Sequence, residues 1–476
     1  MSFDPPRRLH AAHALLPEGW ARDVLLVWDG AGTLTAVSAE TPAPTDAPRA
    51  AGVLLPGLPN LHSHAFQRAF AGLAEYRGDR NDVSNEARTA ASTDDSADSF
   101  WTWRDLMYRF ALAISPDQLE AVATQLYIEM LQAGYTAVCE FHYLHHDPRG
   151  RPYADPAEMA LRLLAAARHA GIGITLLPVL YQHAGFGGTP PRAQQRRFIT
   201  GTEALLDIAA RLRAHGASVG IAPHSLRAVG ARALHDVVAG LHAVDASAPV
   251  HIHIAEQQRE VDDCLAWCGR RPVEWLLANA AVDARWCLVH ATHLNDAERL
   301  ALAASGAVAG LCPSTEANLG DGVFDAAPYL AAGGAWGIGS DSHASVDAAG
   351  ELRWLEYTQR LARQRRNVLT SRAHRQVADH LWLGAVGGGA RASGRSLSGL
   401  AVGQQADFVV LDGSGTLAGL APSQVLASHV FAHSGRGAVR DVWVAGVQRV
   451  HEGRHALERS ACARFVATRR ELLDEV

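Results

Sequence analysis

The sequence predicts an α/β protein: a (β/α)8 TIM-type barrel with a small β-sandwich domain built from both chain ends. Short apolar runs alternate with amphipathic segments about eight times along the middle of the chain, which is typical of a parallel sheet closed into a barrel. Histidine or aspartate directly follows several of these runs, where such a barrel gathers its catalytic groups. Both chain ends instead carry short strand-like pieces. We therefore expect a barrel over residues 56–390 and a sandwich formed by residues 1–55 and 391–476.

The composition is that of a large globular protein. The chain has 476 residues, 48% of them hydrophobic, and its net charge of −6 gives no general attraction to nucleic acid or anionic lipid. No stretch reaches the ~18 apolar residues of a membrane helix, and residues 1–8 carry no apolar signal core. The six cysteines show no paired framework. We therefore expect a cytoplasmic protein that binds neither nucleic acid nor membrane.

The segment that organises the chain lies near its N-terminus. Residues 24–28 and similar pieces before it predict strands of the sandwich. The apolar run 52–55 predicts a short buried strand that leads to His62 and His64. In an extended backbone these two imidazoles face the same side, so both can bind a single metal ion. The alternative is a strand end with two ordinary histidines, and the later chain must supply further ligands to decide.

The next segments predict the surroundings of a pocket. Residues 65–72 have helical character, and the polar residues 79–99 predict a long loop near the entrance of the site. The aromatic cluster at residues 100–104 carries Arg104. This cluster can cover a pocket and present a cation, or it can simply pack in the core.

From residue 118 onward, strand and helix patterns follow one another. The strand patterns cover residues 137–141, 172–180, 219–222, 250–254, 287–290, 308–311 and 336–339. The helical patterns cover residues 121–132, 157–169, 201–215, 231–243, 272–279 and 296–305. Past residue 372 the helical character fades, and residues 399–412 and 439–450 predict strands that pair with the N-terminal ones.

Polar residues follow these strands at the end where a barrel places its active site. They are His62, His64, Tyr143, His224, His253, His290 and Asp341. Structural histidines have no reason to prefer that position, so we expect these side chains to share one site. Neutral imidazoles together with a carboxylate suit a zinc ion that keeps one position open for water. Iron or manganese can occupy similar ligands.

This strand-end set resembles the signature of the amidohydrolase superfamily, in its mononuclear-zinc aminohydrolase branch. Residues 62–68, 99–104, 140–146, 312–322 and 339–343 further resemble the enzymes of that branch that act on N-formimidoyl-L-glutamate. The resemblance covers nearly the whole chain, although the polar segment 79–99 is longer than that of the family. It implies hydrolysis of N-formimidoyl-L-glutamate to N-formyl-L-glutamate and ammonia by a metal-activated hydroxide, a step of histidine degradation.

The resemblance also implies roles at the metal. The expected ligands of one Zn²⁺ per chain are His62, His64, His253 and Asp341. Asp341 would also take the proton of the attacking water, and His290 would form a hydrogen bond to the attacking oxygen. Glu256 would be the general acid for the leaving nitrogen, with a solvated carboxylate as the alternative. His251 shares the face of His253 and is the main rival for its ligand role.

The implied substrate carries two carboxylates, which arginine binds in a bidentate manner. Arg227 is the first choice for this contact and Arg104 the second, although Arg104 can instead form a surface salt bridge. By resemblance, the same pocket is lined by Gln67, Tyr143 and His224, and Tyr143 has core packing as its alternative. Ser342 is a further expected contact. The neighbouring histidines are expected to be structural; they are His142, His145 and His146.

Two rival functions stay open. A guanine or related heterocycle aminohydrolase of the same branch would need aromatic stacking and fewer cations than paired arginines provide. A non-enzymatic binding protein would have a broken ligand set, whereas this sequence retains every ligand. We also expect a homodimer, in which Arg104 serves either its own pocket or a neighbouring one.

Overall fold

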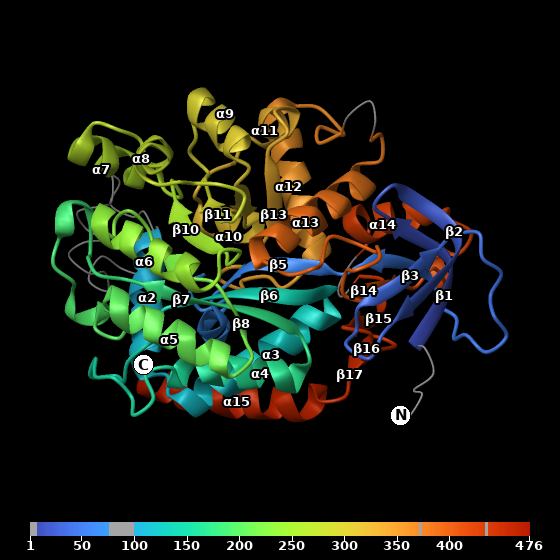
Figure 1. Ribbon diagram of the computed structural model, residues 1–476, viewed down its shortest axis with the longest axis horizontal. Helices are drawn as coiled ribbons and strands as arrows, with labels where there is room; N and C mark the ends of the chain where they lie inside the picture. The colour runs from blue at the N-terminus through green and yellow to red at the C-terminus, as the bar shows by residue number, and fades with distance from the viewer. Residues whose placement is uncertain (1–6, 76–99, 371–373, 434–436) are drawn as a thin grey trace.

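The computed structural model describes residues 7–75, 100–370, 374–433 and 437–476. Figure 1 shows an elongated molecule, with a barrel of strands and helices on one side and a β sheet, built from the blue and red ends of the chain, on the other. The loop predicted at residues 79–99 lies outside the described residues. Among the helices that are described, none combines the length and the apolar character needed to cross a membrane.

The barrel consists of parallel strands in chain order: β5 (Leu58–Ser63), β6 (Tyr135–His142), β7 (Gly173–Leu180), β8 (Ser218–Val219), β9 (Ala222–Pro223), β10 (Val250–Ile254), β11 (Trp286–His290), β12 (Val308–Leu311) and β13 (Ala335–Ile338). β8 and β9 occupy one position in the barrel, because both pair with β7. Parallel ladders join β5 to β7 and β10 to β13. Single bridges close the ring: Ile221 with Val250, Ser225 with His253, and Ser63 with Asp341. The predicted (β/α)8 barrel is confirmed.

Helices surround the barrel: α2 (Phe100–Ala113), α3 (Pro116–Gln132), α4 (Glu158–Ala170), α5 (Thr202–Ala214), α6 (Ala231–Val244), α7 (Gln258–Cys268), α8 (Pro272–Asn279), α9 (Asp296–Ser305), α10 (Pro313–Leu319), α11 (Ala326–Ala331), α12 (Ala348–Arg363) and α13 (Val377–Ser393). Several helix ends are encoded locally. The Ser115 hydroxyl accepts a hydrogen bond from the Gln118 backbone N–H at 3.3 Å, and Pro116 occupies the first turn of α3. Gly171 ends α4 in the left-handed conformation, with φ of 76°.

The barrel strands are buried on both faces. Every residue of β6 and β7 is buried, as expected for parallel strands covered by helices. Helix α13 approaches β13 and β5 closely because glycine occupies the contact. A Cβ at Gly388 would collide with the Trp336 carbonyl, and one at Gly389 would lie 2.9 Å from the Pro59 Cβ. Glycine disfavours a helix by about 1 kcal/mol per residue, so tertiary packing holds α13 in place.

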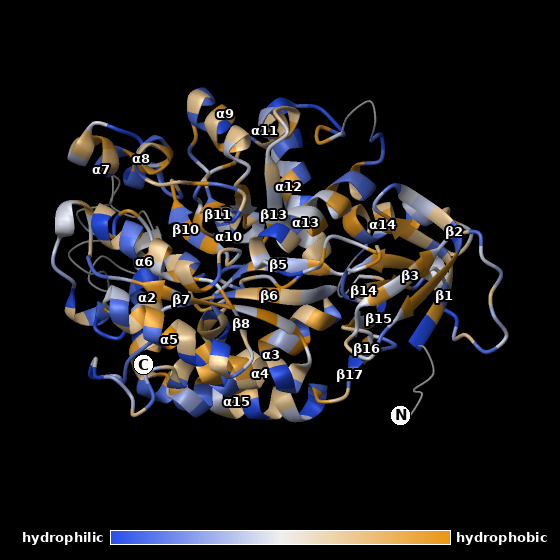
Figure 2. Cartoon of the chain, in the orientation of Figure 1, coloured by the Kyte–Doolittle hydropathy of each residue, from blue (hydrophilic) through white to orange (hydrophobic). Residues whose placement is uncertain are grey.

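The two chain ends build one sheet: β1 (Arg7–Leu16), β2 (Gly19–Trp28), β3 (Leu34–Ser38) and β4 (Val53–Pro56) with β14 (Phe408–Leu411), β15 (Val439–Val444), β16 (Val447–His451) and β17 (Arg454–His455). β4 joins the ends, because it pairs with β1 on one side and β14 on the other. Leu9, Val24 and Phe408 pack in its core, and Figure 2 shows hydrophobic residues along these strands. The prediction that both ends share one β structure is confirmed.

The prediction that helical character fades past residue 372 is wrong. Helix α13 follows directly, and α14 (Pro422–Phe431) and α15 (Glu458–Glu475) lie further along the chain. Helix α15 packs against α3 of the barrel through residues that include Phe465 and Leu472. The glycines of α13 and the low mean hydropathy of α15 hide these helices from sequence patterns. Residue 390 falls inside α13, and the predicted domain boundaries stay a prediction.

Candidate metal centre and active site

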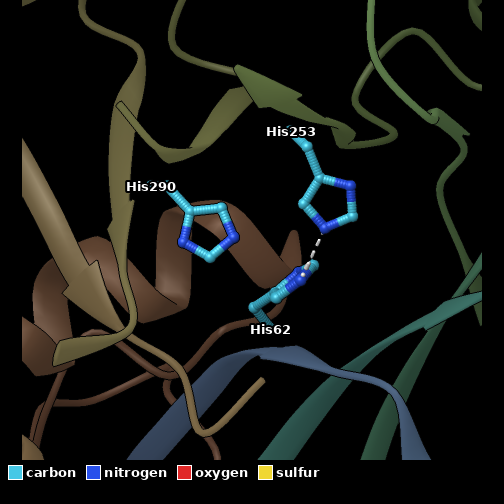
Figure 3. Close-up of side chains that lie close together, drawn as sticks. All are labelled: His62, His253 and His290. Carbon is cyan, nitrogen blue, oxygen red and sulfur yellow. Dashed lines mark hydrogen bonds between the residues drawn. The ribbon is translucent and has the colours of Figure 1, made fainter. Parts of the chain in front are cut away.

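Three imidazoles from distant parts of the chain converge at the carboxyl end of the barrel. His62 in β5 and His64 just after it place their Nε2 atoms 3.1 Å apart. His253 in β10 places its Nε2 atom 3.0 Å from that of His62, as the dashed line in Figure 3 marks. All three side chains are buried. The predicted pairing of His62 and His64 on one face therefore brings both to a common point with His253.

These imidazoles are neutral, and that of His64 presents a lone pair to that point. The His64 Nδ1 atom lies 2.8 Å from the Phe141 carbonyl oxygen, so it carries the proton and leaves Nε2 unprotonated. Burial lowers the pKa of His62 to about 3 and also lowers the pKa values of His64 and His253. The His64 lone pair faces the Nε2 atom of His62 at 3.1 Å, and together with the nitrogen of His253 these atoms can bind one cation.

Asp341 supplies a carboxylate beside these nitrogens. Its Oδ1 atom lies 3.4 Å from the Nε2 atoms of both His62 and His64. The backbone fixes this position, because the Asp341 N–H donates to the His62 carbonyl at 3.0 Å and the residue adopts a left-handed φ of 44°. Burial opposes ionisation, but the hydrogen bond with His62 and the nearby His290 outweigh it and keep the pKa of Asp341 below its ordinary value.

His290, at the end of β11, lies on the same site. Its ring is nearly parallel to that of His253, with centroids 5.6 Å apart, as Figure 3 shows. Its Nε2 atom lies 3.6 Å from Asp341 Oδ2 and 3.7 Å from Glu256 Oε1, and its Nδ1 atom lies 3.3 Å from Glu316 Oε1. Burial disfavours the charged ring, but these carboxylates, Glu256 first, raise the pKa of His290 to about 10.

The donor atoms fit a divalent metal ion. Within 4.8 Å of one another lie ligand atoms of three overlapping sets: His62 with His64 and Asp341, His62 with His253 and His290, and His290 with Cys312 and Asp341. Imidazole nitrogens and a carboxylate oxygen are ligands that divalent transition metals prefer. Burial raises the pKa of the Cys312 thiol well above its ordinary value, so this group stays protonated at neutral pH. The His and Asp side chains thus form a divalent metal site.

One cavity joins this site to the remaining predicted residues. Its lining includes Gln67, Arg104, Tyr143, His224, Arg227 and Glu256, together with His64, His253, His290 and Asp341. These predicted residues thus lie around one cavity. His62 and Ser342 are not among the lining residues, and the Ser342 hydroxyl lies 3.0 Å from the buried Thr315 hydroxyl.

Several contacts orient the lining residues. The Gln67 amide donates a hydrogen bond to the Tyr143 hydroxyl at 2.9 Å. The His224 Nδ1 atom lies 3.1 Å from the Ser225 hydroxyl. Arg227 Nη2 lies 3.9 Å from Glu256 Oε2 and 3.7 Å from the buried Glu260 carboxylate. These contacts orient Gln67, Tyr143, His224 and Arg227 beside the metal site.

The histidines that neighbour the site bind backbone carbonyls instead. The Nε2 atom of His251 lies 2.8 Å from the Ala392 carbonyl, and His251 belongs to none of the ligand sets found among the described residues. His145 and His146 bind the carbonyls of Val179 and Ile199 in the same way, each at 2.8 Å. Deep in the barrel, His251 thus anchors α13, while His253 reaches the metal site.

The sequence did not single out the residues that support the site. Ser63, between His62 and His64, donates a hydrogen bond to Glu140 at 2.6 Å, and the Ala65 N–H donates to the same carboxylate at 2.6 Å. The Tyr127 hydroxyl donates to it at 3.1 Å. Burial raises the pKa of Glu140 to about 7. Glu140 lies within the apolar run of β6, and this position in the sequence could have indicated a supporting network, because a buried carboxylate needs hydrogen-bond partners.

Known proteins resemble this chain over nearly its whole length. The profile described as the amidohydrolase family matches residues 53–449. A formimidoylglutamate deiminase of Pseudomonas aeruginosa is 54% identical over 98% of this chain and 99% of the relative. An 8-oxoguanine deaminase of the same organism is 30% identical over 75% of this chain and 74% of the relative.

Solved structures show the same architecture. An amidohydrolase of Brucella melitensis superposes with a TM-score of 0.89 and 48% identity, and the match covers 98% of this chain and 100% of that one. An adenosine deaminase of Xanthomonas campestris with bound zinc superposes with a TM-score of 0.76 at 22% identity and covers 99% of both chains. The second likeness concerns the fold alone.

Proposed function

Since the chain belongs to the amidohydrolase family, we propose that it hydrolyses N-formimidoyl-L-glutamate to N-formyl-L-glutamate and ammonia. The Pseudomonas aeruginosa deiminase supports this substrate by its 54% identity. The observation that carries the proposal is that one cavity joins the His/Asp metal site to two guanidinium groups. A substrate with an amidine-like carbon and two carboxylates matches both ends of such a cavity. The reaction would be a step of histidine degradation.

The metal ligands are proposed to be His62, His64, His253 and Asp341, which would hold one Zn²⁺ per chain. Neutral imidazoles with one carboxylate favour zinc, although iron or another divalent metal can use similar ligands. When bound, such an ion supplies Lewis acidity and a water of lowered pKa, near ~7, as the nucleophile.

The chain's own residues move the protons. Asp341 is placed to accept the proton of the attacking water at Oδ2, which lies 3.6 Å from His290 Nε2. His290 Nε2 donates a hydrogen bond to the attacking oxygen and so holds it in line. Glu256 is the general acid that protonates the leaving nitrogen, because its Oε1 atom lies 3.7 Å from His290 and burial raises its pKa. Loss of ammonia then leaves the formyl product.

The substrate carboxylates are proposed to bind Arg227 and Arg104, with hydrogen bonds from Gln67, Tyr143 and His224. Arg227 lies in the cavity wall, with a side chain 16% exposed. Arginine suits this role because its planar fork meets both oxygens of a carboxylate. The Gln67–Tyr143 hydrogen bond supports the joint placement of these two groups near the metal site.

Ammonia release from N-formimidoyl-L-glutamate tests this function, with guanine and 8-oxoguanine assayed beside it. We expect turnover of N-formimidoyl-L-glutamate and none of the purines, because Arg104 and Arg227 present two guanidinium groups to the cavity, which suit a dicarboxylate. Turnover of a purine alone would instead favour the rival function suggested by the 30% identical 8-oxoguanine deaminase. Absence of all three activities in metal-loaded protein would favour a non-enzymatic binding protein.

We further propose that the protein is a cytoplasmic homodimer. All six cysteines are free, which suits a reducing compartment. Light scattering coupled to size-exclusion chromatography gives the mass of the assembly, and a mass near that of one chain would contradict the dimer.

A further inference from the structure

Two tyrosines and a glutamine line or support the cavity beside the two arginines. Tyr108 in α2 and Tyr181 after β7 both line the cavity. The Arg104 guanidinium carbon lies 5.6 Å from the centre of the Tyr108 ring. Phe198 packs on both phenol rings, with centroids 6.0 Å from Tyr108 and 5.8 Å from Tyr181. Gln195, 1% exposed, lies behind them.

The orientation of the Gln195 amide follows from its hydrogen bonds. Its Oε1 atom accepts from the Arg192 backbone N–H at 2.9 Å, which an amide nitrogen could not do. The Nε2 atom therefore faces the tyrosines, and it lies 3.1 Å from the Tyr108 hydroxyl and 2.8 Å from the Tyr181 hydroxyl. Both amide hydrogens are donated, so both phenol oxygens act as acceptors toward Gln195.

The phenol hydrogens must then point elsewhere. Both tyrosines line the cavity, so the Tyr108 hydroxyl is free of Gln195 as a donor and can donate its hydrogen into the cavity. Together with the guanidinium groups of Arg104 and Arg227, this part of the cavity wall offers hydrogen-bond donors. A carboxylate accepts on both oxygens, whereas a carboxamide brings an NH₂ group from which neither guanidinium can accept a hydrogen bond.

We infer that Gln195, Tyr108 and Tyr181 form a hydrogen-bond-donating subsite that selects a substrate carboxylate over the corresponding carboxamide. The inference rests on the proposed function for the identity of the substrate. Tyr108 contacts the carboxylate, and Gln195 is a positioning residue that acts through the two phenols. A site built to donate rejects an amide strongly, because the mismatched polar groups lose their partners on binding.

The test compares N-formimidoyl-L-glutamate with its α-monoamide and its γ-monoamide. For the wild type we expect kcat/KM for the diacid to exceed that for at least one monoamide by about 10³-fold. Tyr108→Phe removes one oxygen and should lower that ratio about tenfold, chiefly through the KM of the diacid. Gln195→Glu turns both phenol hydrogens toward the new carboxylate and should lower the ratio further. In both variants kcat for the diacid and the bound metal should stay near wild type.

Tyr357→Phe is the matched control, because Tyr357 lies in α12 and is absent from the cavity lining. An acid-to-amide ratio in Tyr108→Phe and Gln195→Glu that equals that of this control would overturn the inference. If the wild type does not turn over the diacid, the proposed function fails by itself. In that case calorimetry measures the affinity of the same variants for N-formyl-L-glutamate and its monoamides. An acid-to-amide affinity ratio in Tyr108→Phe and Gln195→Glu that equals that of the control would overturn the subsite.

Discussion

The Nη2 atom of Arg227 lies 3.9 Å from the Glu256 carboxylate inside the cavity. These residues have separate expected tasks, substrate binding for Arg227 and proton donation for Glu256. Their proximity couples the tasks. Burial raises the pKa of Glu256, whereas His290 and Arg227 oppose that rise. A substrate carboxylate that pairs with Arg227 would weaken its pull on Glu256, and so favour the protonated acid when substrate is bound.

Arg227→Ala should raise the KM for the diacid about a hundredfold with unchanged metal content, because it removes a charge-assisted contact. Steady-state kinetics and elemental analysis on the same preparation check this. Arg232→Ala is the control, since that side chain is 96% exposed. Equal loss of bound metal, or an unchanged KM, would count against the role of Arg227.

Glu256→Gln should lower kcat by about 10²- to 10⁴-fold while KM and metal content stay near wild type, because the amide cannot donate the proton required by the leaving nitrogen. Glu274→Gln, with a side chain 53% exposed, serves as the control. A loss smaller than about tenfold would mean that another group protonates the nitrogen.

Asp341→Asn should nearly abolish turnover and weaken metal binding, because the amide is a poorer ligand and no base. Cys312→Ala should keep both, although Cys312 lies within ligand distance of Asp341 and His290. The measured quantities are bound metal per chain and ammonia release. Substantial activity in Asp341→Asn, or loss of metal in Cys312→Ala, would contradict the ligand assignment.

Asp407→Asn should stabilise the protein in a pH-dependent way. Burial raises the pKa of Asp407 to about 6, above its ordinary 3.8, so the wild type favours the neutral acid when folded. The contribution of Asp407 to the free energy of unfolding is therefore fully present below about pH 4. It is lost as pH rises through 6, which lowers the free energy of unfolding of the wild type by up to about 3 kcal/mol. An asparagine keeps the hydrogen bond from the Ala445 N–H and cannot ionise.

Denaturant unfolding of Asp407→Asn and wild type at pH 4 and pH 7.5 measures this effect. The variant should gain stability relative to wild type between the two pH values, and the exposed Asp474→Asn control should not. A constant difference between variant and wild type at both pH values would show that Asp407 titrates normally.

The barrel and its metal site were predictable because their signals are local. An apolar run sets each strand, and the residue that follows it must lie at the carboxyl end, so His253, His290 and Asp341 could be assigned before their contacts were known. The choice between His251 and His253 was open by periodicity alone. It is decided by depth in the barrel, since His251 reaches the Ala392 carbonyl of α13.

The features that sequence analysis missed depend on contacts between distant segments. Helix α13 contains three consecutive glycines, which disfavour a helix until β13 and β5 pack against it. The donor direction of Tyr108 depends on Gln195, 87 residues away along the chain, whose own orientation is set by a backbone N–H. No local pattern encodes such a pairing.

The most direct test of the central claim is ammonia release from N-formimidoyl-L-glutamate during titration of chelator-treated protein with zinc. The account predicts that activity is absent without metal, rises in proportion to added zinc and levels off at about one equivalent per chain. It also predicts that the His62→Ala protein shows no such rise. Full turnover in metal-free protein, or a rise that ignores the loss of His62, would contradict it.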